Sequence, residues 1–294
     1  REYSADATRF ALADAGDGLE DANVSLTVTA NAAILKLTKE VEWCQEMQAR
    51  VQDLPHVQKE KTLIERIFAN RINECIVNAD QAYSRMQFRA ALKSGFWDLC
   101  HARDSYRAHV SDDQICPELI QRFMEVFTIV LAPICPHVCE HIWSNVLGRS
   151  GFVIDASWPT AGAIDETLLQ ISKYLEDVAH SVQVKLKELA KKKGKSEPRK
   201  VTFQFAQTYP VWQQTVINLI SEMDDFAIQD RRKVSSVINA TFAASPELTM
   251  FDKRAVKFAM NVIDEVNTKG RQVALASTTP FDEETILCDN IATI

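Results

Sequence analysis

The stretch that decides the fold is residues 131–143, Leu-Ala-Pro-Ile-Cys-Pro-His-Val-Cys-Glu-His-Ile-Trp. It continues an apolar helical pattern, yet it contains two prolines, Pro133 and Pro136, three positions apart. Proline removes a backbone donor and clashes with the preceding turn, which costs about 3 kcal/mol inside a helix. Two prolines so close together therefore predict a sharp bend in an otherwise buried helix.

The polar residues of this stretch have both a chemical and a structural interpretation. His137 and Glu140 suggest acid–base catalysis, but no third group orients them, so we expect them to bond the backbone carbonyl that proline frees. Cys135, Cys139 and His141 lie close enough in sequence to share a helix face, but a structural zinc site needs four ligands. We therefore predict no catalytic residue and no metal site.

Apolar residues recur at intervals of three and four through most of the first 165 residues, which is typical of amphipathic helices. Ser4 is the expected N-cap of a first helix that stops at Gly16, and Pro117 lies where a helix start tolerates proline. The pattern predicts helices over about 4–15, 21–46, 61–82, 88–110 and 117–131, packed as an antiparallel bundle. Trp143 and Trp158 are expected to fill its core rather than to stack on bases.

The pattern changes after residue 165. Residues 166–197 predict another amphipathic helix that ends in a Lys-rich linker. Residues 201–206 alternate apolar and polar side chains as a strand does, residues 271–276 are a possible second strand, and helical patterns lie between them. We therefore predict a mainly α chain with three parts: a helix bundle over 1–165, the helix and linker over 166–197, and a small α+β domain over 198–294, which we expect to be truncated.

The net charge of −7 is unevenly distributed. Residues 1–184 carry 17 basic and 26 acidic side chains, whereas residues 185–294 carry 16 and 14. Eight basic residues cluster in one short stretch: Lys185, Lys187, Lys191, Lys192, Lys193, Lys195, Arg199 and Lys200. Such a cluster either neutralises nucleic-acid phosphates or is a solvated linker. Five more basic residues on polar helix faces are weaker candidates for phosphate contacts: Arg66, Arg71, Arg85, Arg89 and Lys93.

Several classes of protein are disfavoured by composition. The chain has only 8 glycines in 294 residues and lacks the glycine-rich motifs that cradle phosphates, so nucleotide chemistry is not expected of it. No apolar run reaches the roughly 18 residues of a membrane span. The seven cysteines are odd in number and lie mostly in helical patterns, which favours reduced thiols. We expect a cytoplasmic protein without a membrane segment.

Residues 131–143 resemble the helix-bundle domain of class I aminoacyl-tRNA synthetases of the Leu, Ile, Val and Met group. Four further segments add to this resemblance: 3–12 (Tyr-Ser-Ala-Asp-Ala-Thr-Arg-Phe-Ala-Leu), 156–159 (Ala-Ser-Trp-Pro), 209–213 (Tyr-Pro-Val-Trp-Gln) and 281–283 (Phe-Asp-Glu). In this order they resemble the leucyl-tRNA synthetases of the archaeal and eukaryotic cytosolic type. The last two matter most, because valyl and isoleucyl relatives carry differently built tails.

The resemblance implies a parent enzyme that uses ATP and Mg to activate leucine and transfers it to tRNA(Leu). This chain lacks the His-x-Gly-His and Lys-Met-Ser-Lys-Ser types of motif that such catalysis needs. We therefore expect it to be an inactive C-terminal part with no cofactor of its own. Its implied partners are tRNA(Leu), its own catalytic domain and proteins of a multi-synthetase assembly. Asp6 and Arg9 are expected to form a structural pair that joins the bundle to the catalytic domain.

The predicted function is tRNA docking by the bundle, with phosphate contacts from the lysine cluster and the last domain towards the long variable arm of tRNA(Leu). Two alternatives stay open at this point. An acidic helical bundle is also typical of a non-catalytic protein-interaction module in a synthetase complex. A valyl-type or isoleucyl-type synthetase is the other alternative.

Overall fold

The computed structural model describes residues 3–18, 26–54, 60–191, 202–203, 209–276 and 280–290. The chain divides into two compact units, one formed mainly by residues up to Gln183 and the other by Val184–Asp289. Throughout the described ranges the regular structure is helical, without a strand. The predicted mainly α class is therefore confirmed, whereas the three-part boundaries remain a prediction.

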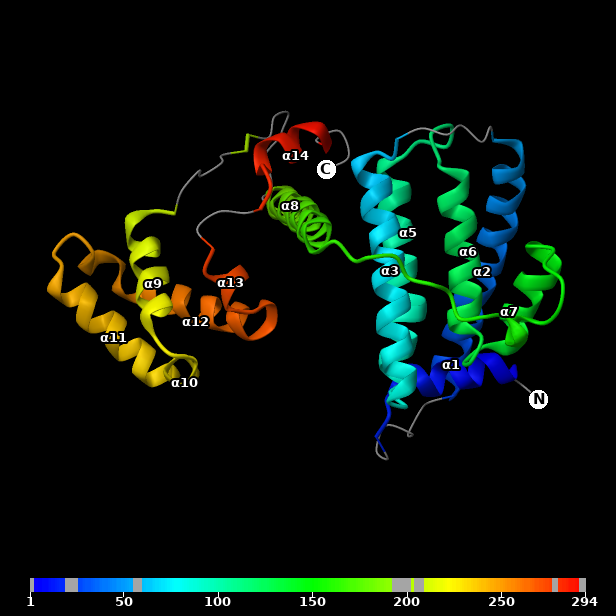
Figure 1. Ribbon diagram of the computed structural model, residues 1–294, viewed down its shortest axis with the longest axis horizontal. Coiled ribbons are helices and arrows are strands. Elements are labelled where there is room, and N and C mark those ends of the chain that lie inside the picture. The colour runs from blue at the N-terminus through cyan, green and yellow to red at the C-terminus, as the bar shows by residue number, and fades with distance from the viewer. Residues whose placement is uncertain are drawn as a thin grey trace. The chain divides into compact units, whose positions relative to one another are not determined.

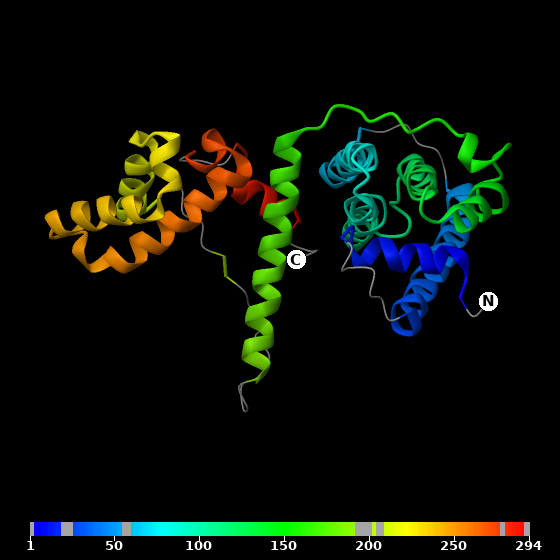
Figure 2. The same cartoon turned by 90° about the horizontal axis from the view of Figure 1, so that it is seen from below.

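The first unit is an antiparallel helix bundle (Figure 1). Its elements are α1 (Ala5–Ala15), α2 (Leu26–Asp53), α3 (Leu63–Ser84), α4 (Phe88–Leu92), the π-helical segment η1 (Lys93–Asp98), α5 (Leu99–His109), α6 (Pro117–Leu131), α7 (Pro136–His141), the π-helical segment η2 (Ile142–Val146), the 3-10 turn η3 (Val153–Asp155) and α8 (Glu166–Lys191), which continues past Gln183. The long helices α2, α3, α5 and α6 lie side by side, and α1 crosses one end of them (Figure 2).

Local sequence signals account for the helix ends. The Ala7 backbone N–H donates to Ser4 Oγ over 3.1 Å, so Ser4 is the N-cap of α1, and α1 ends before Gly16. Pro117 occupies the first turn of α6, as predicted. Thr62 and Glu65 form a capping box at the start of α3. The Asp21 position, from which a second helix was predicted to start, lies outside the described residues.

Aromatic side chains fill the centre of the bundle. Phe68 of α3 stacks on Tyr106 of α5 with ring centroids 4.7 Å apart, and Phe123 of α6 packs on both Phe68 and Phe127. All four rings are buried. Each buries about 150–250 Å² of apolar surface, so this cluster is the main attachment between α3, α5 and α6.

The double-proline stretch is a complete break between two helices and not a kink within one. Helix α6 ends at Leu131, and α7 begins with Pro136 in its first turn. The Leu131 carbonyl accepts from the backbone N–H groups of Ile134 and Cys135, both over 3.0 Å, which closes the intervening turn. Because each proline lacks the donor that a continuous helix requires, the predicted bend is present but sharper than a kink.

Close packing around Gly95 of η1 predicts a clear effect of adding a methyl group. A Cβ at Gly95 would lie 2.8 Å from Val130 Cγ1 of α6. We expect Gly95→Ala to lower the free energy of unfolding by about 1–2 kcal/mol in urea denaturation, because the side chains must separate. Combining it with Val130→Ala should lower stability by less than the two single changes together. Full additivity would contradict this contact.

The second unit is also helical where it is described. Its elements are α9 (Val211–Glu222), α10 (Asp225–Gln229), α11 (Arg231–Ala244), the 3-10 turn η4 (Thr249–Phe251), α12 (Asp252–Lys269), α13 (Arg271–Ala274) and α14 (Glu283–Asn290). Its core is formed by α9, α11 and α12, with Val216, Ile238 and Phe242 fully buried. Trp212 of α9 stacks on Phe251 at a centroid distance of 5.5 Å.

The predicted α+β class of residues 198–294 is therefore not supported, and its strand at 271–276 is wrong. Residues 271–276 begin with α13 instead of a strand, and Arg271 at the start of α13 binds the end of α9. Its guanidinium donates to the Ser221 carbonyl over 2.8 Å and to the Met223 carbonyl, and it pairs with Asp225 at 2.7 Å. Of the other predicted strand, 201–206, only residues 202–203 are described, and these have no regular structure.

Candidate functional site

Helix α1 holds the break between α6 and α7 through two charged side chains. The Asp6 carboxylate, only 2% exposed, accepts from the Val138 backbone N–H over 2.7 Å and lies 2.9 Å from His137 Nδ1. Arg9 donates from Nε to the Ile134 carbonyl over 2.7 Å and from Nη2 to the Pro133 carbonyl over 2.6 Å. One helix thus supplies both an acceptor and donors to the backbone groups of the break.

These contacts correct two predictions. Asp6 and Arg9 were expected to form a structural pair that joins the bundle to the catalytic domain, but within this chain each binds the proline segment instead of the other. Their contact with the catalytic domain stays a prediction. His137 and Glu140 were expected to bond the carbonyl that proline frees, but the His137 ring lies against the Asp6 carboxylate instead. The Glu140 carboxylate instead accepts from the Val153 backbone N–H over 2.8 Å and so ties α7 to η3.

The remaining residues of this stretch are structural. Trp143 and Trp158 pack against the bundle core, and Trp158 makes an edge-to-face contact with Tyr83 at 5.9 Å. Burial, followed by the charge of Asp6, raises the pKa of the Cys135 thiol to about 12, and burial raises that of Cys139 well above its ordinary value. Metals bind the thiolate, so neither cysteine is a ready ligand. Within the described ranges no cluster of three metal-ligating side chains occurs.

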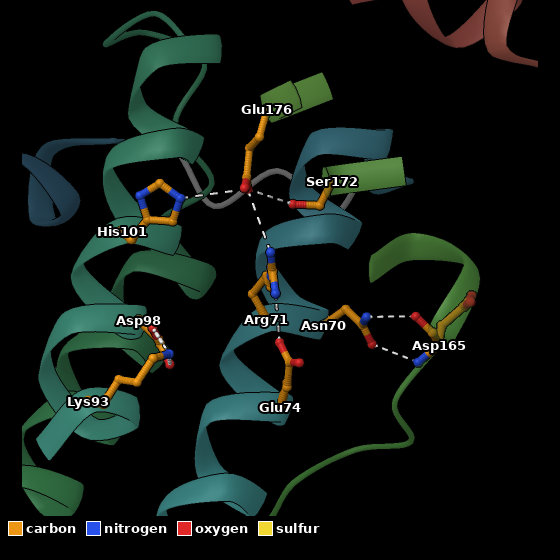
Figure 3. Close-up of polar contacts among 9 residues, drawn as sticks. All are labelled: Asn70, Arg71, Glu74, Lys93, Asp98, His101, Asp165, Ser172 and Glu176. Atoms are coloured by element: carbon orange, nitrogen blue, oxygen red, sulfur yellow. Dashed lines mark hydrogen bonds and ion pairs between the residues drawn. The ribbon is translucent and has the colours of Figure 1, made fainter. Parts of the chain in front are cut away.

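Two of the five basic residues predicted on helix faces are bound within the bundle (Figure 3). Arg71 of α3 pairs with Glu74 at 2.9 Å and with Glu176 of α8 at 3.6 Å. Burial lowers the pKa of Arg71, but its hydrogen bond with Glu74 and the nearby carboxylates raise the pKa overall. Lys93 pairs with Asp98 at 2.7 Å. These two cations are therefore poorly suited to phosphate.

The Glu176 carboxylate connects α8 to the bundle. It lies 3.7 Å from His101 Nε2 of α5 and accepts from the Ser172 hydroxyl over 3.1 Å (Figure 3). At the start of α8, the Asn70 side chain of α3 exchanges two hydrogen bonds with the Asp165 backbone, at 2.9 and 2.8 Å. The role of Arg71 is thus to position α8 on α3.

The other three predicted arginines are exposed. Arg66 lies in the first turn of α3, whereas Arg85 and Arg89 lie where α3 ends and α4 begins. None of the three guanidinium groups has a partner among the described residues. Arg66 is 19 positions before Arg85, or about 28 Å along the helix at 1.5 Å per residue. The structure therefore does not bring the predicted residues into one patch.

Residues 85–89, which we call the α3–α4 corner, form an exposed basic and apolar surface. Met86 has φ 56, which is unusual for a residue with a side chain, and is 70% exposed, while Phe88 is 44% exposed. The Asp17 carboxylate accepts from the backbone N–H groups of Phe88 (2.9 Å) and Arg89 (3.2 Å), which fixes the start of α4. Sequence reasoning missed Asp17, because it lies 71 positions from Phe88 and no local pattern links them.

The lysine cluster is described only in part. Lys185 and Lys187 are exposed on α8, and Lys191 is the last residue of that helix. The other five members lie outside the described residues: Lys192, Lys193, Lys195, Arg199 and Lys200. The cluster as a phosphate-binding segment therefore remains a prediction.

Comparison with known proteins identifies the class of domain. Residues 65–201 match the family model described as the anticodon-binding domain of tRNA ligase. The match begins within α3 and covers the rest of the first unit, including the proline break and α8. From α3 onwards the bundle thus resembles an anticodon-binding domain, a class of domain that implies tRNA binding.

Similar proteins then define the family. The chain is 37% identical to the cytoplasmic leucine–tRNA ligase of Pongo abelii over 99% of its own length and 25% of that protein. It is 34% identical to the cytoplasmic leucine–tRNA ligase of Dictyostelium discoideum, over 99% of this chain and 28% of that protein. It is 42% identical to that of Arabidopsis thaliana, over 60% of this chain and 16% of that protein. The predicted resemblance to leucine–tRNA ligases is thus confirmed, and the chain spans about a quarter of the length of the first two relatives.

The valyl and isoleucyl alternatives and the protein-interaction alternative are not favoured by these matches. These three relatives carry the word cytoplasmic in their names. None of the helices in the described parts of the chain combines the length and apolar character that crossing a bilayer requires.

Proposed function

We propose that this chain binds tRNA(Leu) and positions it for ATP-dependent leucylation by the catalytic domain of a longer enzyme. The match to anticodon-binding domains supports tRNA as the partner, and the relatives' names support leucine as the amino acid. The observation that carries the proposal is the α3–α4 corner, where two exposed arginines without internal partners flank exposed apolar side chains. Such a surface suits folded RNA, whose phosphates bind guanidinium groups.

The corner is well suited to contacts that position RNA without reading its sequence. Arg85 and Arg89 supply charge for phosphates, while the exposed Met86 and Phe88 offer apolar surface to ribose or to an unpaired base. Asp17 fixes the backbone between them, so little order has to be gained on binding. Contacts from Arg66 at the other end of α3 would engage a different part of the RNA.

Rigidity of the bundle is the second element of the proposed mechanism. Transfer of leucine to the end of a tRNA requires a fixed distance between the part of the tRNA that the bundle binds and the end that reacts. The contacts of Asp6 and Arg9 with the proline segment fix α1, α6 and α7 together, and Glu176 fixes α8 on α3. The bundle would thus act as a stiff spacer, with its own residues binding and orienting RNA and performing no bond-breaking step.

The other partners and cofactors belong to the same proposal. ATP and Mg would be bound by the catalytic domain, since this sequence lacks the motifs for them and needs no cofactor to bind RNA. The catalytic domain of the same enzyme and proteins of a multi-synthetase assembly are the proposed protein partners. A cytoplasmic location agrees with the relatives' names. The lysine cluster would add phosphate contacts towards the variable arm.

The α3–α4 corner can be tested by removing its charges. We expect Arg85→Ala with Arg89→Ala to weaken binding of a tRNA(Leu) transcript roughly tenfold and to reduce the slope of log K against log salt by about 1–2, because two phosphate contacts are lost. Filter binding over a series of salt concentrations measures both quantities.

Lys93→Ala is the matched control, because it removes a cation one turn beyond Arg89 that is already paired with Asp98. We expect it to change tRNA affinity by less than about twofold. An equal loss in the control and in the double variant would mean that only overall charge matters. A wild-type chain with no affinity for tRNA would overturn the proposed function itself.

A further inference from the structure

Positive charge is concentrated on two helices of the second unit that sequence patterns did not single out. Residues 231–260 carry six basic and only two acidic side chains, in a chain whose net charge is −7. The six are Arg231, Arg232, Lys233, Lys253, Arg254 and Lys257. All six are exposed, on α11 and on the first half of α12. Such a local excess is expected where the partner is anionic.

An open groove of about 600 Å³ lies between these two helices. Helix α11 lines it with polar side chains and α12 with apolar ones: Arg231, Arg232, Ser235, Ser236 and Asn239 from α11, and Val256 and Met260 from α12. The groove follows two turns of α11, or about 12 Å. Guanidinium, hydroxyl and amide groups are the donors that proteins use to bind phosphate and ribose oxygens.

Helix stability does not explain the cations at the start of α11. Arg231, Arg232 and Lys233 begin α11, where the helix dipole disfavours positive charge by about 0.3–1 kcal/mol each. The Asp230 carboxylate offsets part of this by accepting from the Arg232 and Lys233 backbone N–H groups, at 3.0 and 3.2 Å. The Arg231 guanidinium pairs with Asp264 of α12, so its charge is already partly neutralised.

The remaining polar lining is available to a ligand. Among the residues that the structure describes, the side chains of Arg232 and Asn239 have no partner, and both are exposed. Arg232 therefore contributes an unneutralised charge at one end of the groove, and Asn239 a free amide at the other. Val256 and Met260 of α12 add apolar lining that can contact a ribose or base face.

We infer that the groove between α11 and α12 is a second RNA-binding site, which holds the sugar–phosphate backbone of the tRNA without reading its sequence. This inference rests on the proposed function, because it takes tRNA as the partner. Charge complementarity favours RNA, and the mixture of donors along an open surface fits a backbone better than a buried base. The site is independent of the α3–α4 corner, so the two can fail separately.

The test uses the full chain and a tRNA(Leu) transcript. We expect Arg232→Ala with Asn239→Ala to weaken binding about fivefold and to reduce the salt slope by about 0.7–0.9, the value for one lost phosphate contact. The loss should be the same for a tRNA without a long variable arm, because a backbone contact is indifferent to sequence. Arg232→Lys should retain the salt slope. Thermal melting followed by circular dichroism establishes that each variant folds.

Lys233→Ala is the matched control, since it removes a neighbouring cation that does not line the groove. We expect it to alter affinity by less than about twofold. The groove site is overturned if the double variant binds like the wild type with the same slope, as it would if the groove received a protein. It is also overturned if Lys233→Ala loses as much as the double variant. If the α3–α4 corner variant binds tRNA weakly while the groove variant binds it like the wild type, only the groove site is overturned. If the wild-type chain binds neither of the two tRNAs, both the groove site and the proposed function are overturned.

Discussion

Replacing Arg103 with Met is expected to lower the free energy of unfolding of the bundle by about 3–5 kcal/mol, the usual result of removing one partner from a buried ion pair. Arg103 of α5 is only 5% exposed and binds Glu40 of α2 through both terminal nitrogens, with Nη2 and Oε1 3.2 Å apart. Its guanidinium also lies 4.4 Å from the Trp43 ring centroid. Without it, the Glu40 carboxylate stays largely buried and loses its partner.

The cause of this loss can be isolated with a double variant. Changing Arg103 to Met and Glu40 to Leu removes both charges and should recover most of the lost stability, because an apolar pair of similar size is often as stable as a buried ion pair. Urea denaturation of the wild type, both single variants and the double variant gives the coupling energy. If Arg103→Met alone costs less than about 1 kcal/mol, water must reach Glu40, which would contradict the buried pair.

Arg103 also illustrates which features the sequence could predict. Helix positions followed from apolar spacing, and helix ends followed from Ser4, Gly16 and Pro117, because these signals act within one or two turns. The partner of Arg103 could not be predicted in this way, since Glu40 is 63 positions away. Polar pairs between helices depend on how the helices pack, and periodicity contains no information about which charges meet.

The candidate binding residues show the same division. The polar helix faces of the sequence correctly predicted that Arg71, Arg85 and Arg89 lie outside the apolar core. They could not predict that Glu74 and Glu176 bind Arg71, whereas Arg85 and Arg89 have no partner among the described residues. The groove between α11 and α12 was missed because its residues come from two helices. The predicted strand at 271–276 was wrong because a run of six residues without regular alternation is weak evidence for a strand. The contact of Arg271 with the end of α9 could not be foreseen either, because Ser221 lies 50 positions away.

The break between α6 and α7 gives the second large expected effect. Asp6→Ala should lower the free energy of unfolding by about 3 kcal/mol, because hydrogen bonds to a charged group contribute roughly 1.5–3 kcal/mol each and the Val138 N–H is left unbonded. Asp6 is also the negative charge beside the first turn of α7, where the helix dipole favours an anion. Chemical denaturation at neutral pH measures the loss.

Two further variants separate this contact from a general effect of charge. Asp6→Asn keeps an oxygen that can accept from the Val138 N–H, so we expect it to lose less stability than Asp6→Ala. Asp80→Ala removes an exposed carboxylate of α3 and should change stability by less than about 0.5 kcal/mol. Hydrogen exchange at the Val138 amide should accelerate in Asp6→Ala and stay slow in Asp80→Ala. An unchanged exchange rate in Asp6→Ala would mean that α7 is held by its apolar contacts alone, and the rigidity proposed for the bundle would then have to come from its core.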